Sequence, residues 1–147
     1  MALDRDERPW GSYVVLDEGP DYKVKTITVF PGKRISYQRH ARRQEHWLVV
    51  HGMGLVTLDG EDHDVQPGSA VDVPVAVAHR IANTATAEPL TFIEVQRGDY
   101  FGEDDIVRIE DDYGRTDAAP PGMLSGSSSS ISTEHSPKVS HRSIQGW

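Results

Sequence analysis

The hydrophobic residues of this chain occur in short runs separated by turn residues, and no run has the sustained 3.6-residue period of an amphipathic helix. The runs typical of strands are YKVKTITV (22–29), ISYQ (35–38), HWLVV (46–50), MGLVTL (53–58), AVDVPV (70–75) and TFIEV (91–95). Asp59-Gly60 predicts a tight hairpin turn, and Pro-Gly or His-Gly pairs mark turns at 31–32, 51–52 and 67–68. The pattern predicts an all-β barrel or sandwich. In the 22–29 run, Lys23 and Lys25 share a register with Ile27 and Val29, so alternation alone does not assign its inward face.

The length of 147 residues suits one domain with its own core. We expect an N-terminal extension at 1–7, a domain at 8–115 and a disordered tail at 116–147, because the tail is rich in Ser, Pro and Gly and poor in apolar residues. No stretch of about 18 apolar residues suggests a membrane span, and the charged N-terminus has no signal-peptide core. We therefore expect a cytoplasmic protein with no membrane partner. The absence of cysteine excludes disulfides, thiolate metal sites and cysteine nucleophiles.

The charge distribution favours an anionic small molecule over a nucleic acid. A net charge of -8 is unlike the basic surface of a nucleic-acid-binding protein, so we expect no nucleic-acid partner. Segment 33–43 nevertheless carries several cations and no acid, whereas segment 99–112 is strongly acidic. The basic segment either is a solvated surface or binds an anion such as a phosphate ester.

Two blocks of the sequence have metal-ligand spacing, and they include Gln38, His40, Glu45 and His79. Gln38 and His40 lie two residues apart in an extended run, so they share a face of the strand. Glu45 has the wrong parity for an uninterrupted strand, which predicts a bend over residues 41–44. An amide, two imidazoles and a carboxylate suit a divalent first-row metal. The other histidines (46, 51, 63, 135 and 141) are interpreted as packing or surface residues.

The two blocks, Gly32 to Gly52 and Gly68 to Asn83, resemble the two motifs of the cupin superfamily, which are small antiparallel β-barrels (double-stranded β-helix or jelly-roll) with a metal in the barrel mouth. Two positions depart from the usual pattern: Gln38 replaces a histidine, and Ala76 replaces a glycine, which is tolerable unless residue 76 has positive φ.

A narrower resemblance covers residues 8–115. The segments RPWGSYVVLDEG, PGKRISYQRHARRQEHWLVVHG and IEVQRGDYFGEDDIVRIEDDYGR are similar to the type II phosphomannose isomerase domain, which usually forms the C-terminal part of a bifunctional enzyme behind a mannose-1-phosphate guanylyltransferase domain. No glycine-rich nucleotide-binding segment precedes residue 8, so we expect a stand-alone domain that transfers no nucleotides.

The resemblance implies reversible conversion of mannose 6-phosphate to fructose 6-phosphate through an enediol, a step that supplies GDP-mannose and polysaccharide synthesis. Zinc is the expected metal, with manganese, iron, cobalt and nickel as alternatives. By family position Arg43 is the non-ligand catalytic candidate; it would orient phosphate or stabilise negative charge, because an arginine stays protonated. Lys25 is a candidate phosphate contact or base, with a surface lysine as the alternative. Arg108 and Arg115 either contact substrate or pair with neighbouring acids, and pairing is the favoured interpretation, although Arg108 is retained as a candidate substrate contact.

Two alternatives remain open. The chain could be a non-catalytic cupin that binds metal and sugar phosphate, working as a sensor or beside a separate guanylyltransferase. It could also catalyse another cupin reaction, such as isomerisation of a different sugar or dioxygenation. A homodimer is the expected assembly, by analogy with small cupins.

Overall fold

The computed structural model describes residues 4–102, 104–115 and 139–140, and these residues form strands with no helix among them. The strands are β1 (Asp4–Arg8), β2 (Gly11–Glu18), β3 (Tyr22–Val29), β4 (Tyr37–Arg39), β5 (Arg43–His51), β6 (Gly54–Leu58), β7 (Glu61–Val65), β8 (Ala70–Val73), β9 (His79–Asn83), β10 (Leu90–Gly98), β11 (Val107–Glu110) and β12 (Val139–Ser140). The all-β prediction is confirmed. Within these ranges no helix is long and apolar enough to cross a membrane.

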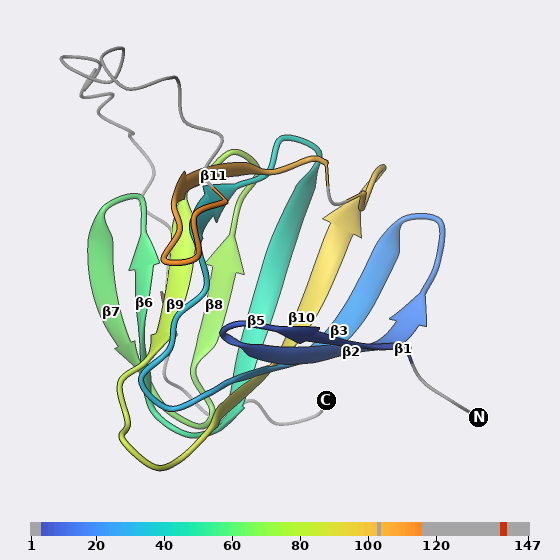
Figure 1. Ribbon diagram of the computed structural model, residues 1–147. Helices are drawn as coiled ribbons and strands as arrows, with labels where there is room; N and C mark the ends of the chain where they lie inside the picture. Colours follow the sequence, from blue (N-terminus) through green and yellow to red (C-terminus); the bar gives the residue numbers. More distant parts are fainter. Residues whose placement is uncertain (1–3, 103, 116–138, 141–147) are drawn as a thin grey trace, which may run out of the picture.

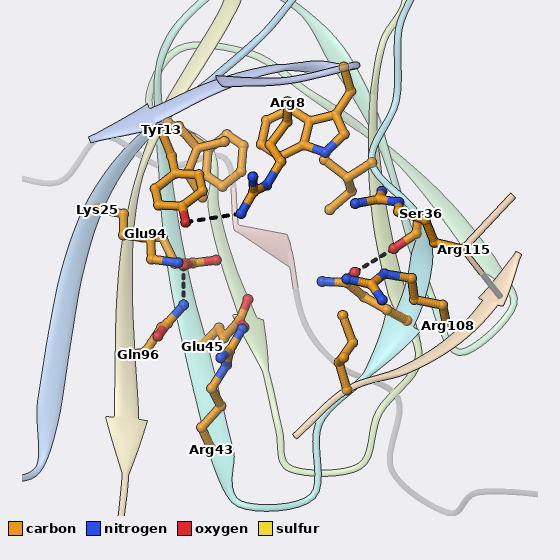
Figure 2. Close-up of a pocket in the computed structure, with 16 residues that line it drawn as sticks. Arg8, Tyr13, Lys25, Ser36, Arg43, Glu45, Glu94, Gln96, Arg108 and Arg115 are labelled. Atoms are coloured by element: carbon orange, nitrogen blue, oxygen red, sulfur yellow. Dashed lines mark hydrogen bonds and ion pairs between the residues drawn. The ribbon is translucent and has the colours of Figure 1, made fainter. Parts of the chain in front are cut away.

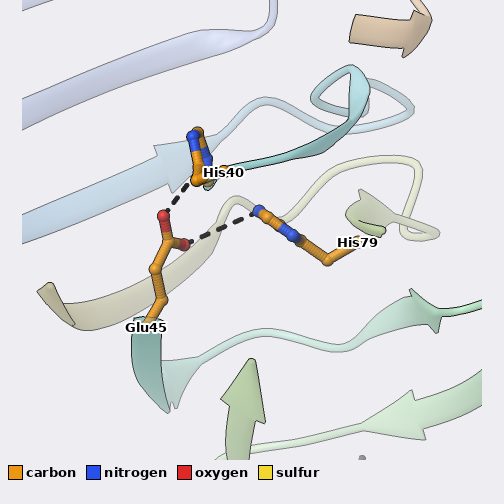
Figure 3. A group of neighbouring side chains, drawn as sticks. All are labelled: His40, Glu45 and His79. Atoms are coloured by element: carbon orange, nitrogen blue, oxygen red, sulfur yellow. Dashed lines mark ion pairs between the residues drawn. The ribbon is translucent and has the colours of Figure 1, made fainter. Parts of the chain in front are cut away.

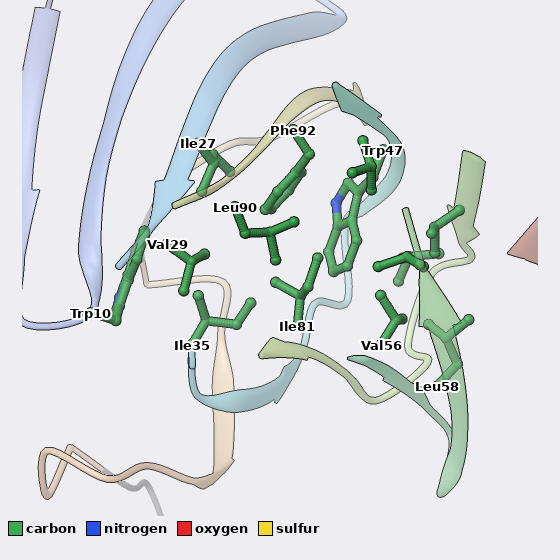
Figure 4. Packing of buried hydrophobic residues seen from close by; sticks show 14 residues of the cluster. Trp10, Ile27, Val29, Ile35, Trp47, Val56, Leu58, Ile81, Leu90 and Phe92 are labelled. Atoms are coloured by element: carbon green, nitrogen blue, oxygen red, sulfur yellow. The ribbon is translucent and has the colours of Figure 1, made fainter. Parts of the chain in front are cut away.

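The strands form two antiparallel sheets that face each other (Figure 1). One sheet has seven strands in the order β1-β2-β3-β10-β5-β8-β12, and the other has five in the order β11-β4-β9-β6-β7. The hydrophobic core lies between them: Trp47 and Phe92 from the larger sheet pack in one cluster with Val56, Leu58 and Ile81 from the smaller sheet (Figure 4). Each sheet therefore buries one face, as the short alternating runs of the sequence require.

Two strands lie outside the expected domain limits. β1 begins at Asp4, within the segment expected as an extension. It pairs with β2 in an antiparallel register, with Asp4 opposite Val15 at one end and Arg8 opposite Gly11 at the other. β12 lies within the segment expected as a disordered tail and pairs with β8. The rest of that tail, 116–138 and 141–147, is outside the described residues.

The turns confirm one prediction and decide a condition that the sequence left open. Asp59 and Gly60 both have positive φ, 49° and 84°, between the paired strands β6 and β7, which is the predicted two-residue hairpin turn. Ala76 has φ 68°, so the residue that replaces the cupin glycine does occupy the left-handed region. Because a Cβ is disfavoured in that region, this alanine carries backbone strain.

The register of the three central strands creates a polar end inside the barrel. The inward residues of β3, β10 and β5 are apolar at one end, where Val29 pairs with Leu90 and Ile27 with Phe92. At the other end Glu94 pairs with Lys25 on β3, and Gln96 pairs with Glu45 on β5. These inward residues are Lys25, Arg43, Glu45, Glu94 and Gln96, and all are buried. Buried polar groups need hydrogen-bond partners or a ligand, so this end of the barrel is the candidate binding site.

Candidate metal centre

His40, Glu45 and His79 converge at this polar end, although His79 comes from the second block of the sequence (Figure 3). One ligand atom from each residue lies within 4.8 Å of the others. Glu45 Oε2 is 3.3 Å from His40 Nε2, and Glu45 Oε1 is 3.8 Å from His79 Nε2. All three residues are buried. We call these three residues the ligand cluster.

Both histidines present an unprotonated Nε2 to the cluster. The Nδ1–H group of His40 donates to the main-chain carbonyl of Asp105 at 2.6 Å, and that of His79 donates to the carbonyl of Val77 at 2.9 Å. Because the neutral ring carries its proton on Nδ1, the Nε2 lone pair is left for a metal. Burial lowers the pKa of His40 to about 4 and also lowers the pKa of His79, so both rings are neutral at pH 7. Among the described residues, His79 Nε2 is buried without a hydrogen-bond partner.

Glu45 supplies the negative charge. Burial acts to raise its pKa, but the charge of Arg43, together with the charges that His79 and His40 carry once protonated, outweighs burial and holds the pKa well below the usual range. Trp47 Nε1 donates to Oε1 at 3.0 Å, which fixes the carboxylate from the core side. Two neutral imidazoles and one ionised carboxylate in a buried cluster form a donor set that fits a divalent first-row metal. The residues present therefore fit the metal that the fold implies.

Gln38 and Arg43 both contact His40 Nε2, one of the ligand atoms. The Gln38 Nε2 lies 3.4 Å from His40 Nε2, while its Oε1 accepts a hydrogen bond from the Ser36 hydroxyl. Arg43 donates through Nε to Glu45 Oε2 at 2.9 Å and through Nη2 to His40 Nε2 at 3.1 Å. A cation on the cluster would compete with this guanidinium for both atoms, and Arg43 already lines the neighbouring pocket.

That pocket opens beside the cluster and is lined by cations and aromatic rings (Figure 2). Its cations are Arg8, Lys25, Arg43, Arg108 and Arg115. Of the cations in the basic segment 33–43 that suggested an anion site, only Arg43 lines this pocket; Arg34 and Arg42 instead form exposed ion pairs with Asp112 and Asp99. The positive lining is therefore assembled from several separate elements.

The predicted substrate contacts take different positions. Lys25 is buried with Nζ 4.2 Å from the centre of the Tyr13 ring, and Arg108 lines the pocket from β11. Arg115 pairs with Asp111 at 2.8 Å while still lining the pocket. The sequence left pairing with an acid open for both Arg108 and Arg115, and the structure shows such an ion pair for Arg115.

Sequence reasoning missed two groups at this site. Glu94 lines the pocket on β10, and Gln96 Nε2 donates to its Oε1 at 2.6 Å. Burial and then the charge of Glu45 raise the pKa of Glu94 to about 8, whereas Lys25 acts to lower it. Asp105 is the other missed group, because its carboxylate accepts from the main-chain N–H of Ala41 and Arg42. The sequence did hold a signal for Glu94: alternation along TFIEVQ (91–96) places it on the same face as Phe92.

The bend before Glu45 is shorter than expected. β5 begins at Arg43, so the turn occupies residues 41 and 42 and not the whole of 41–44. From Arg43 onward the buried residues alternate, which places Glu45 and Trp47 inside and His46 outside, where it contacts Asp72 at 2.8 Å. The outward prediction for His46 is confirmed.

Fold and site together define a cupin-type barrel with a potential metal centre. Solved structures support this fold: the capsular polysaccharide assembling protein CapF of Staphylococcus aureus aligns with TM-score 0.66 at 22% identity over 74% of this chain and 34% of CapF. Oxalate decarboxylase of Bacillus subtilis, a protein with Mn(II) centres, aligns with TM-score 0.61 at 18% identity over 73% of this chain and 30% of its own.

Sequence comparison narrows the class further. The family model described as mannose-6-phosphate isomerase C-terminal matches residues 3–111, so the chain belongs to this family. The chain is 48% identical over 120 residues to the alginate biosynthesis protein AlgA of Pseudomonas aeruginosa, covering 82% of this chain and 25% of AlgA. It is 47% identical over 108 residues to a mannose-1-phosphate guanylyltransferase of Salmonella montevideo, covering 74% and 23% respectively. The chain thus spans about a quarter of the length of these curated relatives.

Proposed function

We propose that this chain is a divalent-metal-dependent isomerase that interconverts mannose 6-phosphate and fructose 6-phosphate. The observation that carries the proposal is the buried ligand cluster, whose Glu45 also lines a pocket rich in cations. Membership of the isomerase family supports the reaction type. Zinc is the first choice of metal, with manganese, iron, cobalt and nickel as alternatives that the same nitrogen and oxygen ligands accept.

The reaction moves a proton between C1 and C2 of the open-chain sugar, so it needs a base beside the carbon chain. Among the described residues that line the pocket, the carboxylic acids are Glu45 and Glu94. Because Glu45 belongs to the ligand cluster, Glu94 is the proposed proton-transfer group: one carboxylate oxygen takes the C2 proton and returns it to C1, while the hydroxyl proton of O2 passes to O1 through the enediol. Burial and Glu45 raise the pKa of Glu94 to about 8, so the base form is the minor, ionised fraction at pH 7, and Lys25, its neighbour across the strand pair, acts to increase that fraction.

The charged residues would hold the rest of the substrate. His40, Glu45 and His79, with Gln38 beside them, would bind the metal, which supplies Lewis acidity at the sugar carbonyl when bound. Arg108, from β11, would contact the phosphate group. Arg43 lies between the cluster and the pocket, so it is placed to stabilise negative charge that develops on the sugar oxygens.

A coupled assay for fructose 6-phosphate tests the proposal with chelator-treated protein reloaded with each of the named metals. We expect activity with at least one metal, a loss of about 100-fold or more in Arg43→Ala, and no detectable activity in His79→Gln. His51→Gln is the matched control, because His51 is exposed and lies outside the cluster. If none of the reloaded samples forms product, the isomerase proposal is wrong.

Glu94→Gln tests the proton-transfer role separately. The amide keeps the shape of the carboxyl group but cannot accept a proton, so kcat should fall by about 10²- to 10⁴-fold. Metal affinity, measured in the same preparation by chelator competition, should remain close to that of the parent protein. A variant with unchanged kcat would remove Glu94 from the mechanism.

The second candidate is a non-catalytic module that binds metal and sugar phosphate and works beside a separate guanylyltransferase. It is favoured by the fact that the matched region is about a quarter of longer relatives, one of them named as a guanylyltransferase. Mannose 6-phosphate binding in calorimetry without turnover, together with co-purification of a guanylyltransferase, would support it. Three predictions remain: that the chain supplies GDP-mannose synthesis, that it is a homodimer and that it is cytoplasmic. Light scattering can test the homodimer, and cell fractionation can test the location.

A further inference from the structure

Ser36 is a buried hydroxyl at the edge of the candidate metal centre. It precedes β4 and is 2% exposed. The chain beside it is fixed, because the N–H of Ile35 donates to the carbonyl of Ile81 at 3.1 Å and the carbonyl of Ile35 accepts from Arg80 Nε at 2.9 Å. The Ser36 hydroxyl donates to Oε1 of Gln38. Ser36 thus holds one end of the Gln38 amide from a rigid position.

The other end of that amide meets the ligand cluster. Gln38 Nε2 lies 3.4 Å from His40 Nε2, which is an acceptor because the ring proton is on Nδ1. Only the oxygen of an amide can bind a cation, so Gln38 can be a ligand only when the amide is turned by half a rotation. That rotation exchanges the two ends: Oε1 takes the place beside His40, and Nε2 takes the place beside Ser36.

The Ser36 hydroxyl can accept the rotated amide as readily as it donates now. A serine hydroxyl offers one donor and two lone pairs, and its hydrogen rotates to suit the partner. With Ser36 present, the rotated Nε2–H group has an acceptor; without it, that N–H group would lose this acceptor at a part-buried position. An N–H group that is shielded from water and lacks an acceptor disfavours the orientation that creates it.

We propose that Ser36 is the positioning residue that keeps the Gln38 amide hydrogen-bonded when its oxygen turns towards a divalent metal on His40, Glu45 and His79. The inference rests on the metal centre of the proposed function, and it gives Gln38 a defined orientation as fourth ligand. Groups that orient a metal ligand in this way typically change affinity by about 10- to 100-fold. Ser36→Ala should therefore weaken metal binding by roughly 10-fold or more.

The experiment measures Zn²⁺ and Mn²⁺ affinity by competition with a chromophoric chelator, without sugar phosphate. The variants form a cycle of Ser36→Ala, Gln38→Ala and the double variant, so that action through Gln38 can be separated from a general effect on folding. We expect Ser36→Ala to weaken binding in the parent chain and to have little further effect once Gln38 is alanine. Ser69→Ala is the matched control, because Ser69 is fully buried but its hydroxyl caps the turn at Gln66.

The outcomes separate this inference from the proposed function. An affinity of Ser36→Ala within about twofold of the parent chain, well short of the effect expected of a ligand-orienting group, overturns it. An equal loss in the Gln38→Ala background also overturns it, because that result would indicate a structural role. Absence of any metal binding by the parent chain overturns both this inference and the metal-dependent isomerase. Tight metal binding with the expected cycle but no isomerase activity would leave the inference standing and reject only the proposed function.

Discussion

Replacing Asp105 by alanine should loosen the turn that carries His40. The carboxylate of Asp105 accepts from the N–H of Ala41 at 3.0 Å and from the N–H of Arg42 at 2.9 Å, and both residues directly follow His40. The main-chain carbonyl of Asp105 also holds the His40 ring at 2.6 Å. One loop residue therefore fixes both the backbone and the ring of a proposed ligand.

The magnitude follows from these contacts. Each bond to the carboxylate contributes about 1 kcal/mol, because both N–H groups lie near solvent and water would partly replace the lost acceptor. Asp105→Ala should thus lower the free energy of unfolding by about 2 kcal/mol. Since the main-chain carbonyl remains but its loop is no longer anchored, metal affinity should fall by roughly 10-fold. Asp105→Asn, which keeps one acceptor oxygen, should lie between the parent and the alanine variant.

Urea unfolding and chelator competition measure the two effects. Asp99→Ala is the matched control, because Asp99 pairs with the exposed side chain of Arg42 at 3.2 Å, and such a pair contributes less than about 1 kcal/mol. Metal affinity should be unchanged in that variant. Equal metal affinity in Asp105→Ala and Asp99→Ala would refute the argument that Asp105 positions His40.

Three further predictions concern stability. Ala76→Gly should raise the free energy of unfolding by about 0.5–1 kcal/mol in urea titrations, because glycine removes the strain at φ 68°; an unchanged midpoint would contradict this. Asn83→Ala should lower it by about 2–4 kcal/mol, because the buried amide donates to two main-chain carbonyls and accepts from one N–H. The neighbouring exposed Thr84→Ala is its control, and an equal loss in both variants would contradict the role of the amide. Burial lowers the pKa of His40 from 6.5 to about 4 in the folded protein, so the unfolded chain takes up a proton more readily. As the pH falls from about 7.5 to about 5, the free energy of unfolding of the metal-free protein should therefore decrease by about 2 kcal/mol more than that of His40→Gln. Parallel pH profiles of the two proteins would contradict the shift.

Local patterns predicted a large part of the site. Gln38 and His40 were expected on one face of a strand because side chains alternate along any extended chain, and both do reach the cluster. The Asp59-Gly60 hairpin was predicted for a similar reason, since the backbone of a two-residue turn demands residues that tolerate positive φ. The length of the bend before Glu45 was mispredicted; its two residues donate to Asp105, a residue distant in the sequence whose contact no local pattern indicates.

Alternation and turn chemistry were enough to predict that this protein is all-β, that two of its segments carry residues with metal-ligand spacing, and that one strand face brings Gln38 and His40 together. Alternation and turn chemistry depend on residues that are near neighbours in the chain, so they can be recognised without knowledge of the tertiary structure. Three further features needed the folded chain: Lys25 points inward opposite Glu94, Arg43 is the residue of the basic segment that lines the pocket, and Asp105 anchors the turn after His40. They depend on cross-strand register and on contacts between distant loops, which no local period encodes.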